Sequence, residues 1–253
     1  EKNISVESFV KKNNFSKFFI YQHFFPMCGA IWSVPIRYVK KMPIHSIIVF
    51  FFNHGLLKFT GKPQWRTILN GSKSYVQEFS KKIKGKILLN EQVIKVQRGR
   101  RIYVKSKNYK KYFDKVIFAL HSDDILKVIE KPSKKEKLIF SNCKFKNNEV
   151  IVHQDMSLMP ANKSVWSSWN VINNKQIIKN KVNDNIFVTY WINKLQNIKS
   201  DDPIFVSLNP DSSLQPNKEK ILHKINFKHP ILDIKHIQAT KDIKNLQGKN
   251  NTY

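Results

Sequence analysis

The stretch ILLNEQVIKVQRGRRIYVKSKNYKKYFDKVIFALHSDDILKVI, residues 87–129, carries the strongest fold signal in this chain. It contains a short apolar segment (87–89), then two alternating segments (93–96 and 101–105) on either side of a turn at Gly99. Because apolar residues recur at every second position, the alternating segments predict antiparallel strands with one face toward water. We expect residues 87–89 to form a further short strand.

The same stretch ends in elements that are typical of a return to a larger sheet. Residues 116–120 form an uninterrupted apolar run, as in a strand that is buried on both faces. Ser122, Asp123 and Asp124 follow, and these residue types open helices. We therefore expect an antiparallel layer, followed by a buried strand and then a helix.

Residues before this stretch read as mainly helical. Ser5 is expected to cap a first helix, and Pro43 is expected to open another. The apolar run 44–57 is shorter than the roughly 20 residues of a membrane-spanning helix and contains polar residues, so it predicts a buried helix. A short strand at 64–68, a turn at Asn70-Gly71 and a helix from Ser72 to Lys82 follow.

Residues after the stretch alternate between short apolar segments and turn signals. A short helix is expected at 132–140, and a last helix at 233–246 is followed by Gly248. The segments between them predict a mostly antiparallel sheet, with strands near 150–153, 165–171, 187–192, 204–208 and 221–227.

Several unusual strings occur in one order along the chain: PMCGAIWSVP (26–35), FFNHGLLKF (51–59), QWRTILNGSKSYVQEF (64–79), VIVHQDMSLMP (150–160), VWSSWN (165–170), VTYWINKLQ (188–196) and VSLNP (206–210). With the pattern V-x-x-V … V-I-x-A that begins at Val93, they resemble the flavin-containing amine oxidase family. The resemblance is to an uncharacterised NAD/FAD-binding subgroup, a module of which accompanies some cyclopropane fatty-acid synthases.

The resemblance implies a mixed fold of the α+β and α/β classes. It would combine part of a glutathione-reductase-type FAD domain with an antiparallel-sheet substrate domain that also carries helices. The expected parts are a helical part of the substrate domain (1–62), part of the FAD-binding domain (63–130), the substrate-domain sheet (131–230) and a helix that returns to the FAD domain (231–253). The implied activity is that of an FAD-dependent oxidoreductase, in which the flavin accepts a hydride.

Two features depart from the family pattern. The G-x-G-x-x-G turn that holds the FAD pyrophosphate at a helix N-terminus is absent from the seven glycines. The chain also begins at Glu1 and ends at Tyr253, where relatives continue into a glycine-rich flavin-contacting segment. We therefore expect an internal part of a longer flavoprotein, which by itself binds FAD poorly.

The resemblance assigns cofactor contacts residue by residue. The backbone of Val93 would recognise the adenine, and Ala119 would let the backbone approach the dinucleotide. Gly71 and Ser72 would lie beside the flavin, so Val93, Ala119 and Gly71 are expected close together at an open apolar edge. Arg66 would balance a reduced flavin or hold a lipid phosphate, the alternative being an ordinary ion pair.

His153 and Asp155 are the candidate catalytic residues. At positions i and i+2 of a strand, an imidazole and a carboxylate share one face. They could handle a proton near the flavin, and a structural His–Asp hydrogen bond is the alternative. A metal is not expected, because two ligands are fewer than a metal site needs.

Four aromatic residues are candidates for the wall of an apolar substrate cavity: Trp166, Trp169, Tyr190 and Trp191. Regular pleating places Trp166 and Trp169 on opposite faces, and likewise Tyr190 and Trp191. Packing in the core is the alternative for all four. We expect Trp169 and Trp191 to share one cavity with His153.

The formal charge of +27 is the main compositional feature. The lysines are spread over every segment without a basic arm or an aromatic-basic RNA motif, so nucleic acid is disfavoured as a partner. The charge would repel free polyamines and attract anionic membranes, which favours a phospholipid acyl chain as substrate. The alternative function is a non-enzymatic basic protein that binds nucleic acid or anionic membrane.

Cys28 and Cys143 lie far apart in unlike contexts, which favours free thiols and a reducing cytoplasm over a disulfide. The basic surface would place the protein at the inner face of the membrane. No coiled-coil heptad is present, and the oligomeric state is left open.

Overall fold

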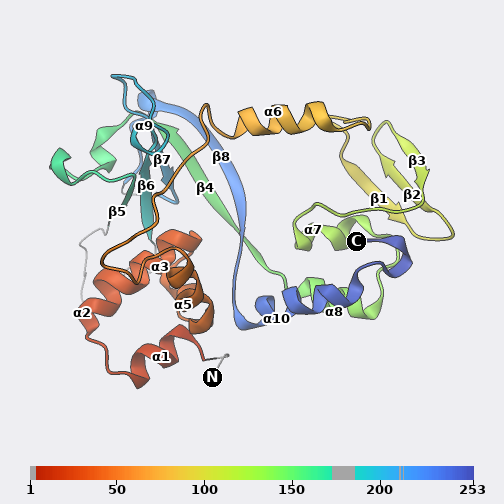
Figure 1. Cartoon of the computed structure of the whole chain (residues 1–253), viewed down its shortest axis with the longest axis horizontal. Helices are drawn as coiled ribbons and strands as arrows, with labels where there is room; N and C mark the ends of the chain where they lie inside the picture. The colour runs from red at the N-terminus through yellow and green to blue at the C-terminus, as the bar shows by residue number, and fades with distance from the viewer. Residues whose placement is uncertain (1–3, 173–185, 211, 213) are drawn as a thin grey trace. The chain divides into compact units, whose positions relative to one another are not determined.

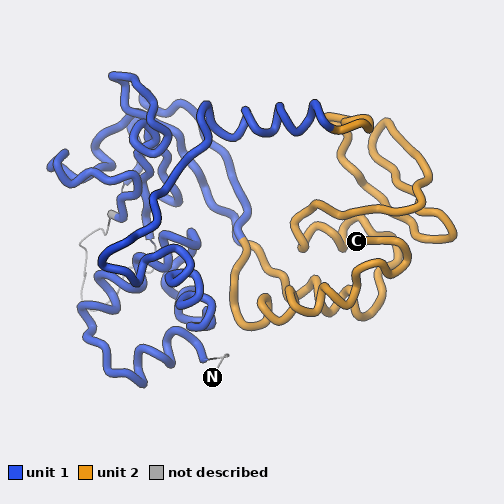
Figure 2. Tube along the Cα trace, in the orientation of Figure 1, with its two compact units in different colours: residues 1–82, 146–229 blue, residues 83–145, 230–253 orange. Residues whose placement is uncertain are grey.

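The computed structural model describes residues 4–172, 186–210, 212 and 214–253 (Figure 1). The chain divides into two compact units, each built from two segments of sequence (Figure 2). Unit 1 consists of Glu1–Lys82 and Lys146–His229, and unit 2 of Ile83–Phe145 and Pro230–Tyr253.

The first part of unit 1 is helical, as the sequence predicts. Ser5 caps the first helix by accepting a hydrogen bond from the Ser8 backbone N–H at 3.1 Å, and Pro43 precedes the fifth helix. Both predicted helix starts are therefore confirmed. The helices are α1 Val6–Lys12, α2 Lys17–Phe19, the π-helix η1 Ile20–Phe24, α3 Phe25–Trp32, α4 Ile36–Val39, α5 Ile44–Asn53 and α6 Ser72–Lys82.

Helix α5 differs from the predicted buried helix. Ile44, Ile47 and Phe51 are buried, but Ile48 and Phe52 on the other face are exposed. Apolar residues occur on both faces of the helix, whereas neighbouring elements of the unit cover one face only. Within the described residues, no helix combines the length and the hydrophobicity needed to cross a membrane.

The second part of unit 1 is a five-stranded sheet. Its order is β5-β6-β7-β4-β8, and β4 with β7, β7 with β6 and β6 with β5 pair antiparallel. The predicted antiparallel sheet after residue 150 is therefore confirmed. Its strands are β4 Phe145–His153, β5 Trp169–Ile172, β6 Phe187–Trp191, β7 Phe205–Leu208 and β8 Ile221–Pro230.

The pairing register assigns each side chain to one of two faces. The His153 face carries His153, Phe205 and Trp191 in one row across β4, β7 and β6, and Ile151, Ser207 and Thr189 in the next row. The opposite Tyr190 face carries Trp169, Tyr190, Val206 and Val152. Each face carries every second row, because successive strand residues point to opposite sides of the sheet.

Helix α3 packs against the sheet on the Tyr190 face. Gly29 leaves room for the Ile186 side chain just before β6, and the Ser33 side chain hydrogen-bonds Tyr190. The His153 face is covered by residues 154–168, where Met159 and Trp166 pack on Phe205. This segment contains the short 3-10 helices η2 Met156–Leu158 and η3 Lys163–Val165.

Unit 2 combines the predicted antiparallel layer with three helices. The strands are β1 Val93–Gln97, β2 Ile102–Ser106 and β3 Lys110–Phe113, in the order β1-β2-β3. The helices are α7 Ser122–Val128, α8 Lys134–Ser141 and α10 Ile234–Ile243. Their core includes Ile125, Ile139, Phe140 and Ala239. Strand β3 was not predicted, because its sequence KKYF has little apolar alternation.

Four predicted details of the chain are wrong. Residues 87–89 and 64–68 are not strands, since no neighbouring strand pairs with them in the described residues. The run 116–120 is exposed at Ile117 rather than buried on both faces, although Val116 and Phe118 pair in parallel with residues 251–253 through backbone hydrogen bonds. Helix α7 has His121 rather than Ser122 at its N-cap.

The remaining short elements connect these parts. In unit 1 they are α9 Ile192–Leu195 and η4 Lys218–Lys220, and in unit 2 they are η5 Lys244–Leu246 and η6 Lys249–Asn251. Cys28 and Cys143 are buried free thiols. The unit boundaries fall after Lys82 and Phe145, whereas the sequence predicted boundaries after residues 62 and 130. The assignment of these parts to cofactor and substrate stays a prediction.

Candidate functional site

His153 is the last residue of β4 and is fully buried on the His153 face. Its Nδ1 accepts a hydrogen bond from the Asp155 backbone N–H at 3.1 Å, so the proton of the neutral ring is on Nε2. Nε2 is 2.7 Å from the Ser207 hydroxyl oxygen and donates to it. Burial lowers the pKa of His153, which keeps the ring neutral.

The hydrogen-bonded chain continues across the sheet. The Ser207 hydroxyl, which accepts from His153, also forms a hydrogen bond with the Thr189 hydroxyl at 2.8 Å. Asn170 on the next strand donates to the Thr189 carbonyl at 3.3 Å and to the Ser167 carbonyl at 2.6 Å. Hydrogen bonds of buried polar side chains, to one another and to backbone carbonyls, thus join four strands.

Asp155 does not form the expected side-chain pair with His153. β4 ends at His153, so the strand alternation that predicted a shared face stops before Asp155. The carboxylate instead accepts from the backbone N–H groups of Ser157 at 3.0 Å and Asn217 at 2.8 Å. Burial opposes its ionisation, but these hydrogen bonds outweigh burial and lower its pKa. Its structural role is to cap η2 and anchor residue 217.

The four candidate aromatic residues divide between the two faces. Trp166 and Trp191 meet edge to face at 5.3 Å, and Trp166 also meets Phe205 at 5.7 Å. Trp169 and Tyr190 meet edge to face at 5.3 Å on the opposite side of the sheet. The expected cavity shared by His153, Trp169 and Trp191 is therefore wrong, because β-pleating places Trp169 on the other face.

A surface hollow of about 590 Å³ lies beside Trp191. Its lining combines an indole and an aliphatic side chain with two lysines: Trp191, Asn193, Lys194, Ile198, Lys199, Ser200 and Asp201. The ammonium of Lys194 lies 5.8 Å from the centre of the Trp191 ring and donates to the Trp166 carbonyl at 3.3 Å. The hollow thus places apolar, cationic and acidic side chains next to one another.

The predicted cofactor residues are found in both units. In unit 2, Val93 opens β1, an edge strand of the three-stranded layer, and Ala119 is exposed. On the outer edge of β1, the described pairing is a bridge between Val96 and Ile129.

In unit 1, Gly71 follows Asn70 in a turn where both residues have positive φ, 74° and 62°. This confirms the predicted turn, and Asn tolerates the conformation that glycine adopts. Ser72 begins α6, and both Ser72 and Arg66 are exposed. Because Gly71 belongs to unit 1 and Val93 to unit 2, their expected proximity stays a prediction.

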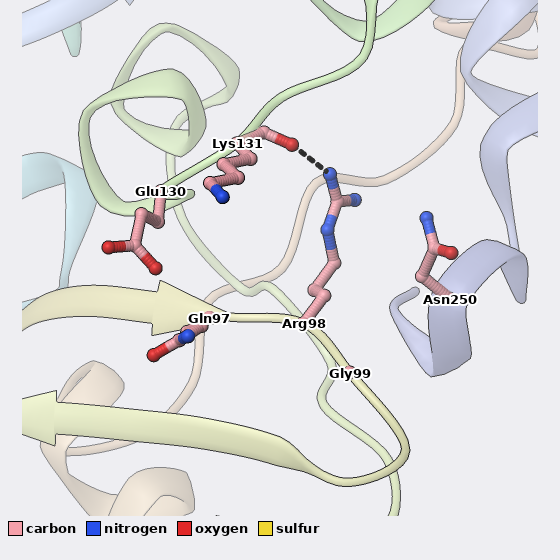
Figure 3. Close-up of a pocket in the computed structure, with 6 residues that line it drawn as sticks. All are labelled: Gln97, Arg98, Gly99, Glu130, Lys131 and Asn250. Atoms are coloured by element: carbon pink, nitrogen blue, oxygen red, sulfur yellow. Dashed lines mark hydrogen bonds between the residues drawn. The ribbon is translucent and has the colours of Figure 1, made fainter.

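A second hollow, of about 390 Å³, lies in unit 2 at the end of β1 (Figure 3). Its lining is polar: Gln97, Arg98, Gly99, Glu130, Lys131 and Asn250. Arg98 is almost buried and binds both carboxylate oxygens of Glu136, while its Nη2 donates to the Lys131 carbonyl at 3.0 Å. Burial opposes ionisation of Glu136, but Arg98 and Ser133 hold its pKa at about 2.

Sequence reasoning did not identify Ser207, Thr189 or Arg98. The string S-x-x-E at Ser133 and Glu136 is a capping-box signal, and the structure shows that box at the start of α8. No comparable signal marks Ser207, because its importance comes from a strand that is 54 residues distant in sequence.

A possible metal set was also sought among the described residues. The ligand atoms of His121, Asp123 and Asp124 lie within 4.8 Å of one another. Asp124 is paired with Lys127 at 2.6 Å, and acidic residues in a first helical turn are favoured by the helix dipole. The pair with Lys127 gives Asp124 a structural role at the start of α7.

No family model matches this sequence, and no curated protein matches it. Among solved structures, a putative protoporphyrinogen oxidase from Exiguobacterium sp. 255-15 superposes with a TM-score of 0.58 and 10% identity, over 92% of this chain and 58% of that one. The likeness is one of fold, a mixed arrangement of helices and antiparallel sheet that the two chains share.

Two further solved structures are less similar. A CLA-producing fatty acid isomerase from P. acnes has a TM-score of 0.49 and 10% identity, over 72% of this chain and 46% of that one. A putrescine oxidase variant has a TM-score of 0.39 and 12% identity, over 57% of this chain and 30% of that one. This chain spans about half the length of the first two matched structures.

Proposed function

We propose that this chain is part of an FAD-dependent oxidoreductase of the amine-oxidase type. The observation that carries the proposal is the fold, in which an antiparallel substrate-type sheet and a three-stranded layer occur in one chain and superpose on a solved oxidase structure over 92% of this chain. Fold likeness is an argument by analogy, so the chemistry needs its own test. Within that family, the sequence strings quoted above favour the subgroup that is associated with cyclopropane fatty-acid synthases.

The residues that would contact FAD are those with accessible backbone or small side chains. Val93 and Ala119 in unit 2, and Gly71 and Ser72 in unit 1, present such groups. Arg66 is exposed and would place a positive charge where a reduced flavin or a phosphate needs one. When bound, the flavin would supply hydride acceptance, and the chain would supply binding and orientation.

An apolar acyl chain on an anionic phospholipid is the proposed substrate class. A chain with a formal charge of +27 repels free polyamines at a distance and attracts anionic lipid. The hollow beside Trp191 pairs apolar side chains with Lys194 and Lys199, which suits an amphiphile. His153 would contribute by positioning the sheet, because its ring is fully buried and hydrogen-bonded at both nitrogens.

The test is to produce the protein from its complete natural gene and record its visible spectrum. A yellow flavin spectrum, followed by anaerobic bleaching on addition of anionic phospholipid but not spermidine, would support both the cofactor and the substrate class. A flavin that only spermidine reduces would overturn the lipid substrate. A colourless protein that binds DNA with a steep salt dependence would instead establish the basic binding protein as its function.

A further inference from the structure

The helical part of unit 1 has an unusual distribution of charge. Residues 8–77 contain no Asp or Glu, although they contain ten basic residues. The basic residues are Lys11, Lys12, Lys17, Arg37, Lys40, Lys41, Lys58, Lys62, Arg66 and Lys73. Glu7 and Glu78 flank this stretch, so a 70-residue segment faces its surroundings with one sign of charge only.

Within this segment, α5 presents an apolar face that no described element covers. Ile48, Val49 and Phe52 follow the i, i+1, i+4 spacing of one helix face, and with exposed Leu56, three residues after the helix end, they form what we name the α5 outer stripe. Their side chains are 43%, 41%, 67% and 39% exposed. Leu56 continues the stripe beyond the helix end, where its N–H donates to the Phe51 carbonyl at 2.8 Å.

The stripe contains no charged group and is bounded by lysines. Helix α5 itself has no Lys, Arg, Asp or Glu, and exposed Lys41 and Lys58 lie just before and just after it. At ten residues the helix is too short to span a bilayer, which needs about 20. An apolar face with cations at its border is the pattern of a helix that lies in the headgroup region of a membrane.

We propose that the α5 outer stripe docks on an anionic lipid surface, with Lys41 and Lys58 placed against lipid phosphates. Lipid is favoured over nucleic acid because the side chains of the stripe, three aliphatic and one aromatic, carry no hydrogen-bond donor for a phosphate or a base, although exposed His45 and Asn53 lie beside them on α5. The proposal does not rest on the flavin chemistry proposed above, because docking requires no cofactor.

The experiment measures sedimentation of the chain with vesicles of phosphatidylcholine alone and with added phosphatidylglycerol. Binding is expected with phosphatidylglycerol and weakens as salt is raised. Phe52→Ser is expected to weaken it roughly tenfold, because the most exposed apolar group of the stripe is removed. The matched control is Leu138→Ser, since Leu138 on α8 is also 67% exposed, and it is expected to change binding less than about twofold.

The charge contribution is tested separately. Lys41→Gln with Lys58→Gln is expected to weaken binding roughly ten- to thirty-fold, at about 1 kcal/mol per lysine. Lys134→Gln with Lys135→Gln removes the same charge from unit 2 and is the control. Equal losses in the two double variants would show a net-charge effect and would overturn a localised surface.

Insertion itself has an independent readout. Because Cys28 and Cys143 are buried, an environment-sensitive dye on Val49→Cys would report the stripe selectively. A blue shift on phosphatidylglycerol vesicles is expected. No vesicle binding would overturn the proposal and leave the stripe to a protein partner or to a further segment of the fold. Binding to DNA that Phe52→Ser leaves unchanged, without vesicle binding, would assign the basic segment to nucleic acid.

Discussion

The Nε2 atom of His153 lies 2.7 Å from the hydroxyl oxygen of Ser207, although the two residues are 54 positions apart in sequence. Both side chains are fully buried, and the same hydroxyl contacts Thr189 at 2.8 Å. A buried imidazole with both nitrogens hydrogen-bonded fixes the tautomer and the register of β4 against β7. The candidate catalytic histidine is thus also a structural element of the sheet.

Ser207→Ala should lower the free energy of unfolding of unit 1 by about 1–3 kcal/mol, because the buried Nε2–H of His153 loses its acceptor. Denaturant unfolding followed by tryptophan fluorescence measures this, since all five tryptophans belong to unit 1. Ser80→Ala is the control, because the Ser80 hydroxyl only donates to the Val76 carbonyl of its own helix. Equal losses of stability in the two variants would contradict a stabilising role of the buried His153–Ser207 hydrogen bond.

The pH dependence of unit 1 should show the titration of His153. Burial lowers its pKa below the ordinary value of 6.5, so the unfolded chain takes up a proton before the folded chain does. Stability is therefore fully present above about pH 6.5 and is lost as the pH falls through the lower, folded-state pKa. His153→Gln, which keeps a donor toward Ser207, should make this loss shallower.

The control for that measurement is His121→Gln, because His121 is exposed and belongs to unit 2. The same tryptophan signal, recorded at a series of pH values, should be unchanged in this variant. A wild-type profile that His153→Gln leaves unaltered would assign the acid sensitivity to other groups.

Arg98→Ala should destabilise unit 2 by about 3–5 kcal/mol, because it leaves the nearly buried Glu136 without its charge partner. Arg101→Ala removes a partner from the exposed pair with Asp114 and should cost less than about 1 kcal/mol. Circular dichroism during unfolding would compare them. In the wild type, ionised Glu136 contributes to the free energy of unfolding of unit 2. This contribution is fully present above the ordinary pKa of 4.5 and is lost as the pH falls toward the folded-state pKa of about 2.

Gly29→Ala should destabilise unit 1 by about 1–3 kcal/mol, although alanine is intrinsically favoured over glycine in a helix. A Cβ at Gly29 would lie 1.8 Å from Ile186 Cδ1. Ile186→Val removes that atom, so the penalty should be smaller in the double variant. Gly85→Ala, where a Cβ would meet nothing within 4 Å, is the control for thermal unfolding.

The sequence by itself determined the local elements of this protein. Ser5 and Pro43 open their helices as predicted, and β1 and β2 form where predicted, although a register shift between Val93 and Lys95 leaves Ile94 exposed. These features depend on contacts within a few residues, so the local order of residue types is sufficient to specify them.

The tertiary structure decided which side chains meet. Trp169 and Trp191 were expected in one cavity, but the register of β5 on β6 places them on opposite faces. Residues 87–89 have the composition of a strand, yet they remain unpaired because a strand requires a neighbour that local sequence does not supply. Ser207 became the partner of His153 only through pairing between distant strands, which no local pattern of residues encodes.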